Sequence, residues 1–178
     1  MQNLITDAEE KRYAELQMLA LDAARHGDSP TLAAMVRAGL PINLQDHKGN
    51  TLLMLAAYHG HEEIAQALLD CGADPDRRNA RGQTPLGGVA FKGTVKIARM
   101  LLDEGADPDA DQGGGTTPLM LASLFGRTEM VAFLQERGAN NNARNRWGFS
   151  AGLLGTVSRI GSRVLHPCGS GSQTPVTS

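Results

Sequence analysis

The chain has 178 residues, of which 41% are hydrophobic and 20% charged, a balance that excludes an intrinsically disordered chain and is typical of one soluble, globular domain. The formal net charge of −2 gives no general case for binding to nucleic acid or to a membrane surface. Two cysteines are too few for a disulfide framework or a cysteine-based zinc cluster.

The first residues, MQNLITDAEEKRYAELQ, have neither the basic stretch nor the long apolar run of a secretory signal. No apolar run in the chain approaches the roughly 18 residues that a membrane span needs. The cysteine content favours a reducing compartment to a small extent. We therefore expect a cytoplasmic protein that has no membrane partner.

The first expected element is a helix that starts at the stretch TDAEE and continues to about His26. Thr6 and Glu9 have the spacing of a capping box, in which each side chain satisfies a free backbone N–H of the first turn. The stretch ALDAARHGDSPTLAAMVRAGLPIN keeps the glycines of the units that follow it. We assign residues 6–45 to an N-terminal capping repeat, whose polar positions suit a unit that faces water on one side.

After this unit, one phrase of the sequence returns at a fixed interval. Its three copies are KGNTLLMLAAYHGHEEIAQALLDCGADPD, RGQTPLGGVAFKGTVKIARMLLDEGADPD and GGTTPLMLASLFGRTEMVAFLQERGANNN. Four columns keep a step of 33 residues: Gly27, Gly60, Gly93, Gly126; Gly39, Gly72, Gly105, Gly138; Gly49, Gly82, Gly115, Gly148; and Thr51, Thr84, Thr117, Ser150. Repetition at this period is typical of proteins built from stacked units.

Each copy predicts a first helix with clear start and stop signals. A threonine such as Thr51 can cap the free N–H groups at its start. Pro85 and Pro118 occupy the following position, where a missing N–H costs nothing. A glycine such as Gly60 suits the left-handed position that ends it. The small residues between these signals, including several alanines, allow neighbouring helices to approach closely.

A second helix follows in each copy. In the first copy, Ile64, Ala67, Leu68 and Leu69 form one apolar face. The polar stretch PDRRNAR then leads into the next copy as a projecting loop or hairpin. One such unit cannot bury its apolar face alone, so the units must stack on one another.

This pattern resembles the ankyrin repeat. The resemblance is carried by GNTLLMLAAYHGH and LLDCGADPD with their two later copies, including GQTP and TTPLMLA, and it covers about residues 14–151. The sequence departs from the family at one column, where a histidine is usual and Met54, Gly87 and Met120 stand instead. In the family that histidine usually forms hydrogen bonds between neighbouring loops.

The resemblance implies an all-α fold, an α-solenoid of stacked helix-turn-helix repeats with short hairpin loops. We expect repeats at 46–78, 79–111 and 112–144 and a partial repeat at 145–155, all in a single domain over 1–155. Residues 156–178 form an irregular tail, because Arg163, Pro167 and Cys168 stand where the pattern requires apolar residues. We expect disorder from about residue 167.

Two adjacent glycines interrupt the second copy. Gly87 and Gly88 lie inside an expected helix, where each costs roughly 1 kcal/mol relative to alanine. They indicate either close packing against the next helix, or local softness and a backbone surface for a ligand.

The columns that the stack leaves free to vary are the candidates for function. The resemblance places these columns on the concave face, at the hairpin tips and the exposed ends of the first helices. The candidate partner-binding residues are Arg25, His47, Lys48, Tyr58, His59, Arg81, Phe91, Lys92, Leu124, Phe125, Arg146 and Trp147.

Aromatic and basic residues gather in these columns. Of the seven aromatic residues in the chain, five fall there: Tyr58, Phe91, Phe125, Trp147 and Phe149. Aromatic and arginine side chains are enriched at the energetic centres of protein interfaces. We therefore expect a protein partner with an acidic and apolar surface. The alternative is structural, with Phe125 and Phe149 packed between repeats and Trp147 covering an unfinished end.

No set of residues predicts catalysis, so we expect a protein that is not an enzyme. His61 starts a second helix, and His59 is expected to point away from it. The glycines at 113–115 lack the lysine and the preceding strand of a phosphate loop. No cofactor or metal is expected. We therefore expect the chain to function in protein–protein recognition.

Three other functions stay open. The chain could be an accessory or immunity-type protein that inhibits a partner enzyme. A small molecule or a metal ion could bind near His47 and His59. Basic residues interleaved with aromatic ones also suit single-stranded nucleic acid, but the positive groups are few.

Overall fold

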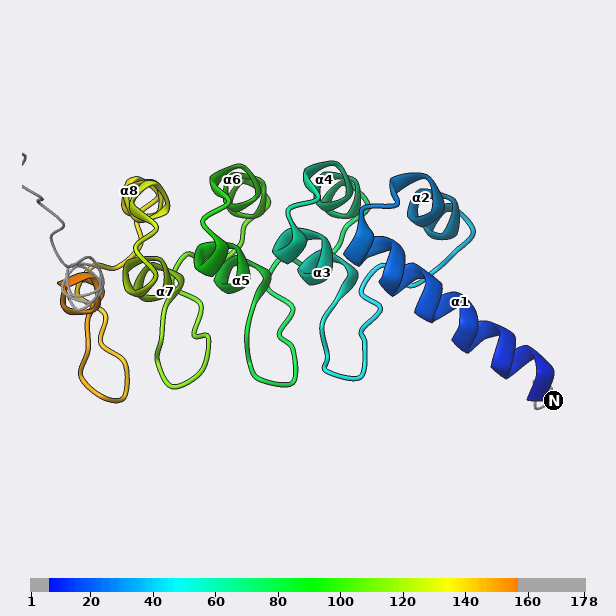
Figure 1. Ribbon diagram of the computed structural model, residues 1–178, viewed down its shortest axis with the longest axis horizontal. Coiled ribbons are helices and arrows are strands. Elements are labelled where there is room, and N and C mark those ends of the chain that lie inside the picture. Colours follow the sequence, from blue (N-terminus) through cyan, green and yellow to red (C-terminus); the bar gives the residue numbers. More distant parts are fainter. Residues whose placement is uncertain (1–6, 157–178) are drawn as a thin grey trace, which may run out of the picture.

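The computed structural model describes residues 7–156. Within this range the helices form two parallel rows, and long loops hang from one side (Figure 1). The inner row is α1 (Asp7–His26), α3 (Leu52–His59), α5 (Pro85–Lys92) and α7 (Pro118–Leu124). The outer row is α2 (Ser29–Arg37), α4 (Glu62–Asp70), α6 (Val95–Asp103) and α8 (Thr128–Glu136). The predicted all-α solenoid is confirmed.

A last hairpin and a further helical stretch, 151–156, end the described part of the chain. The β structure between residues 7 and 156 is limited to one isolated bridge between Gln45 and Thr51. The predictions for Thr6 and for the tail beyond residue 156 fall outside the described residues. No helix in 7–156 combines the length and hydropathy that a bilayer crossing requires.

The predicted threonine caps of α3, α5 and α7 and the glycine stops of α3 and α5 are confirmed. The hydroxyls of Thr51, Thr84 and Thr117 accept the backbone N–H three residues on, so each threonine caps its helix. Gly60 and Gly93 follow α3 and α5 with φ of 84° and 89°. Only glycine adopts this left-handed conformation without strain, which is why both helices end there.

The apolar core runs without a break through the whole stack. Leu52 in α3, Leu86 in α5 and Leu119 in α7 are fully buried. Ile97 and Met130, from two outer helices, are also fully buried and belong to the same cluster. Each buried side chain of this size contributes roughly 1.5–3 kcal/mol relative to exposure, so contact between repeats is the main source of stability.

The apolar face of α4 differs from the prediction in one residue. Ala67 is exposed, whereas Ala65 is fully buried with Ile64, Leu68 and Leu69. At 100° per residue, positions 64, 65, 68 and 69 share one side of the helix, and position 67 lies well outside it. The buried face of α4 is therefore formed by two adjacent pairs four residues apart, and Ala67 lies outside it although it is apolar.

Neighbouring repeats are also joined by hydrogen bonds. The backbone N–H of Ala80 donates to the carbonyl of Lys48 at the hairpin tips, at 3.0 Å. The His61 imidazole bonds to the carbonyl of Arg25 at 2.8 Å. The corresponding positions two repeats further on are also joined, because Arg127 Nε donates to the carbonyl of Phe91.

Gly87 has a specific packing partner, and it is not the next helix. An added Cβ at Gly87 would lie 1.9 Å from Oε1 of Gln112, a residue of the following hairpin. Gln112 is buried, its Oε1 accepts the N–H of Thr84, and its Nε2 donates to the Thr84 hydroxyl. The prediction of packing against the next helix was therefore wrong in its partner, because a hairpin side chain fills the space.

The first helix extends beyond the stack. In α1, only Ala20, Leu21, Ala23 and Ala24 are buried, and they lie in its last two turns (Figure 1). Its earlier residues are almost all exposed. The helix therefore contacts the next unit through its C-terminal end alone.

Candidate functional site

A groove lies between the inner helices α3 and α5 and the first two hairpins. Its volume is about 700 Å³. Its floor is apolar, and its hairpin side is polar and charged. The lining residues are Arg25, Asp46, His47, Lys48, Asn50, Met54, Leu55, Tyr58, His59, Asn79, Arg81, Gln83, Thr84, Pro85, Gly87, Gly88, Phe91 and Leu121. Seven of the twelve candidate residues are in this set.

A row of aromatic rings crosses the ends of three inner helices. The rings of Tyr58 and Phe91 are nearly parallel, with centroids 6.3 Å apart and an interplanar angle of 8°. The Phe91 and Phe125 rings meet edge to face at 4.5 Å. Tyr58 and Phe125 are 41% and 44% exposed, and Phe91 is half-buried between them. These rings support one another and still present apolar area to solvent.

The other candidate residues extend this surface on both sides. Lys92 places its ammonium 4.8 Å from the Tyr58 ring centre. Leu124, at the end of α7, is 36% exposed. On the last hairpin, Arg146 lies over the Trp147 ring at 4.3 Å, and Trp147 is 60% exposed. We call the surface formed by the groove, the ring row and these residues the concave face.

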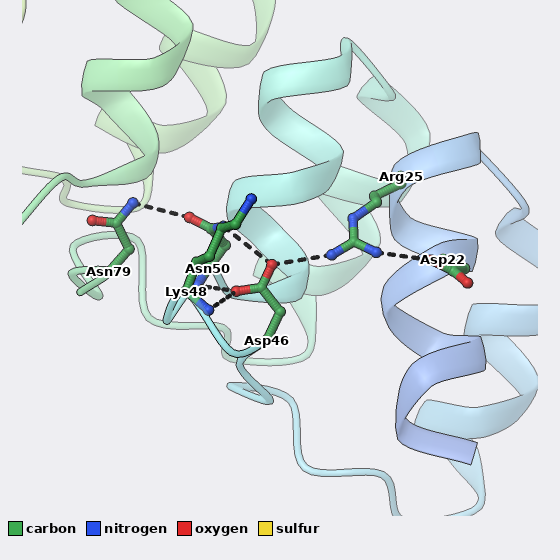
Figure 2. A network of polar contacts seen from close by, with 6 residues as sticks. All are labelled: Asp22, Arg25, Asp46, Lys48, Asn50 and Asn79. Atoms are coloured by element: carbon green, nitrogen blue, oxygen red, sulfur yellow. Dashed lines mark hydrogen bonds and ion pairs between the residues drawn. The ribbon is translucent and has the colours of Figure 1, made fainter. Parts of the chain in front are cut away.

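The positive charge of Arg25 is paired with two aspartates of the chain. Its guanidinium donates to Asp22 at 2.8 Å and to Asp46 at 3.0 Å, which ties α1 to the first hairpin (Figure 2). The Asp46 side chain is only 4% exposed. Asp46 directly precedes the candidate residues His47 and Lys48, but it was not among the predicted residues. Arg25 is consequently a structural link as well as a residue of the groove.

Asp46 and the equivalent hairpin residues were not predicted, although the sequence contains a pattern that identifies them. Asp46 and Asn79 are one 33-residue step apart, and Asn145 stands two steps further on. In each of them a side-chain oxygen accepts N–H groups two and four residues on. A short acceptor side chain before a glycine turn is typical of such loops. Figure 2 also shows the Asn79 amide donating to Asn50, which connects two hairpins.

The Asp46 carboxylate is stabilised in its charged form. Burial alone raises its pKa, but the N–H groups of Asn50 and Lys48, the Asn50 amide and the Arg25 guanidinium together lower the pKa below the ordinary value for aspartate. The site therefore holds a permanent negative charge near neutral pH, and it is matched by Arg25.

Two other cations of the groove have no such partner. Lys48 and Arg81 form no ion pair with any residue in 7–156. Four charged residues line the groove, namely Arg25, Asp46, Lys48 and Arg81. Because the first two pair with each other, the groove retains two positive charges from Lys48 and Arg81.

The side chains of His59 and His61 lie close together. The His59 and His61 rings stack with centroids 6.3 Å apart, so the expectation that His59 points away from His61 was wrong. Partial burial, followed by the nearby charges of His61 and Lys92, lowers the pKa of His59 below its ordinary value. His61 Nε2 is occupied by the Arg25 carbonyl, and within residues 7–156 no group of three or more His, Cys, Asp or Glu is placed to hold a metal ion.

Comparison with known proteins finds similarity to ankyrin repeats. A family model described as ankyrin repeats, three copies, matches residues 20–112 and, in an overlapping alignment, residues 71–145. A protein of Pseudomonas aeruginosa that is named as an ankyrin repeat protein is 54% identical over 35 residues. That second match covers 20% of this chain and 20% of the relative, so the chain aligns with about a fifth of the length of this curated relative.

Proposed function

Because the chain belongs to the ankyrin repeat family, whose repeats generally mediate protein–protein interactions, we propose that it is a non-catalytic recognition module that binds a partner protein through its concave face. The partner carries acidic and apolar groups on the surface it presents. The proposal also places the protein in the cytoplasm.

One observation carries this proposal. The rings of Tyr58, Phe91 and Phe125 form a continuous, partly exposed row. Lys48 and Arg81, which form no ion pair within residues 7–156, line the same groove as the first two rings. The core residues that α3, α5 and α7 supply are leucine, valine, alanine and methionine, so the packing of these helices does not depend on the rings of Tyr58, Phe91 and Phe125. Aromatic side chains are enriched at the energetic centres of protein interfaces, and a positively charged patch is matched by a negatively charged patch on the partner.

The test compares what the intact chain and a double variant bind. Tyr58→Ala with Phe91→Ala removes two rings of the row. Quantitative affinity capture followed by mass spectrometry should show at least one protein that is lost with this variant. The captured protein is then purified, and its direct binding is measured by calorimetry.

The matched control is Tyr13→Ala. Tyr13 is 49% exposed on α1, so Tyr13→Ala removes one exposed ring outside the concave face. Both variants are expected to keep the far-ultraviolet circular dichroism of the parent. Equal loss of the partner with Tyr13→Ala, or full retention with the double variant, would contradict the proposal.

A further inference from the structure

The groove contains a gap that the repeat pattern makes visible. The fourth residue is Leu55 in α3, Gly88 in α5 and Leu121 in α7, and the three stand at 33-residue steps. All three residues line the groove. The middle unit thus lacks a leucine side chain that its two neighbours supply. We call this gap the Gly88 notch.

The fold itself does not require a glycine at this position. An added Cβ at Gly88 would contact only the Tyr58 ring, at an ordinary 3.5 Å, and α5 has helical geometry there with no positive φ. The adjacent Gly87 is different, because Gln112 occupies the space next to it. A mid-helix glycine costs roughly 1 kcal/mol relative to alanine, and packing explains that cost for Gly87 alone.

The notch has a defined chemical character. Its sides are the aliphatic chains of Leu55 and Leu121, and the rings of Tyr58 and Phe91 stand next to it. Lys48 and Arg81 line the same groove on the hairpin side, with no ion-pair partner among residues 7–156. An apolar side chain would fill the notch, and carboxylates near it would pair with these two cations.

We infer that the Gly88 notch receives one leucine-sized apolar side chain from an acidic segment of the partner protein. The flanking carboxylates of that segment pair with Lys48 and Arg81. This inference rests on the proposed function, and it names the kind of segment that the concave face selects. A basic segment is rejected because it would bring like charges together.

The test uses three short blocked peptides as probes. One is a run of glutamates around a central leucine, the second has alanine in place of the leucine, and the third has glutamines in place of the glutamates. Binding to the full-length chain is followed through its backbone amide resonances by heteronuclear NMR. The leucine peptide should shift the amides of Leu55, Gly88 and Leu121, and each of the other two should bind at least about tenfold more weakly.

Two variants of the protein complete the test. Gly88→Leu restores the leucine column and closes the notch, so affinity for the leucine peptide should fall at least about tenfold. Gly152→Leu is the matched control, because Gly152 is exposed and an added Cβ would meet nothing within 4 Å. It should bind as the parent does. Thermal melting of both variants checks that the fold is kept.

The outcomes separate this inference from the proposed function. If Gly88→Leu and the leucine-to-alanine change in the peptide leave binding unaltered, while Tyr58→Ala with Phe91→Ala removes it, the inference about the notch is wrong. The proposal that the partner binds the concave face is then retained. If no peptide shifts the groove amides at millimolar concentration, the notch is also wrong, and the captured partner protein decides the function. If binding is indifferent to every one of these variants, both proposals fall.

Discussion

Two adjacent glycines in α5 show that the effect of one added methyl group on stability depends on its surroundings. An added Cβ at Gly87 would overlap the buried Gln112 side chain, whereas at Gly88 it would make one ordinary contact. Gln112 holds the start of α5 through its two bonds to Thr84. Replacement by alanine should therefore change the free energy of unfolding in opposite directions at these two positions.

We predict that Gly87→Ala lowers the free energy of unfolding by about 2 kcal/mol, because Gln112 must leave buried hydrogen-bond partners. Gly88→Ala should raise it by about 0.5–1 kcal/mol through its higher helix propensity. Urea unfolding monitored by circular dichroism measures both. In the Gln112→Ala background, Gly87→Ala should lose its penalty. A penalty that persists there would show that Gln112 is not its cause.

At the scale of elements, the first hairpin is tied to α1 by the Asp22–Arg25–Asp46 network (Figure 2). The pKa of Asp46 in the folded chain lies below the value it has when unfolded. Its carboxylate therefore contributes stability that is present above the unfolded pKa, near 3.9, and is lost as the pH falls through the folded pKa.

We predict that Asp46→Asn lowers the unfolding free energy by about 1 kcal/mol or less at pH 7, because the guanidinium of Arg25 is partly exposed. The asparagine oxygen can still accept the turn N–H groups, as Asn79 does. Acidification below about pH 4 should then destabilise the variant less than the parent. Urea midpoints across this range test it, with Asp22→Asn as control. Parallel curves for parent and Asp46→Asn would refute the network's role.

Much of each element could be predicted from the sequence because its signals are local. The Thr51 cap and the Gly60 stop act within one or two turns, and the 33-residue step sets the order of the helices. The bonds of Gln112 to Thr84 and of Arg25 to Asp46 span 28 and 21 residues. Such contacts depend on how neighbouring units pack, so spacing within one unit does not reveal them.

At the scale of the whole molecule, each repeat contacts only its neighbours, and position in the stack should decide what a lost side chain costs. Leu86 in the central α5 is fully buried, with units on both sides, and Leu21 in α1 is 8% exposed at the end of the stack. We predict a loss of about 3–4 kcal/mol for Leu86→Ala and about 2 kcal/mol for Leu21→Ala. Urea unfolding gives both values. Amide exchange should also be slowest in α5, and equal costs with uniform exchange would contradict this gradient.

The position of Trp147 makes this gradient observable by simple spectroscopy. It is the single tryptophan of the chain and lies on the last hairpin, with Arg146 over its ring. Its fluorescence therefore reports loosening at one end of the stack, while far-ultraviolet circular dichroism averages over every helix. Melting curves from the two signals coincide only when the repeats unfold together. Their separation measures how far the last repeat frays ahead of the others.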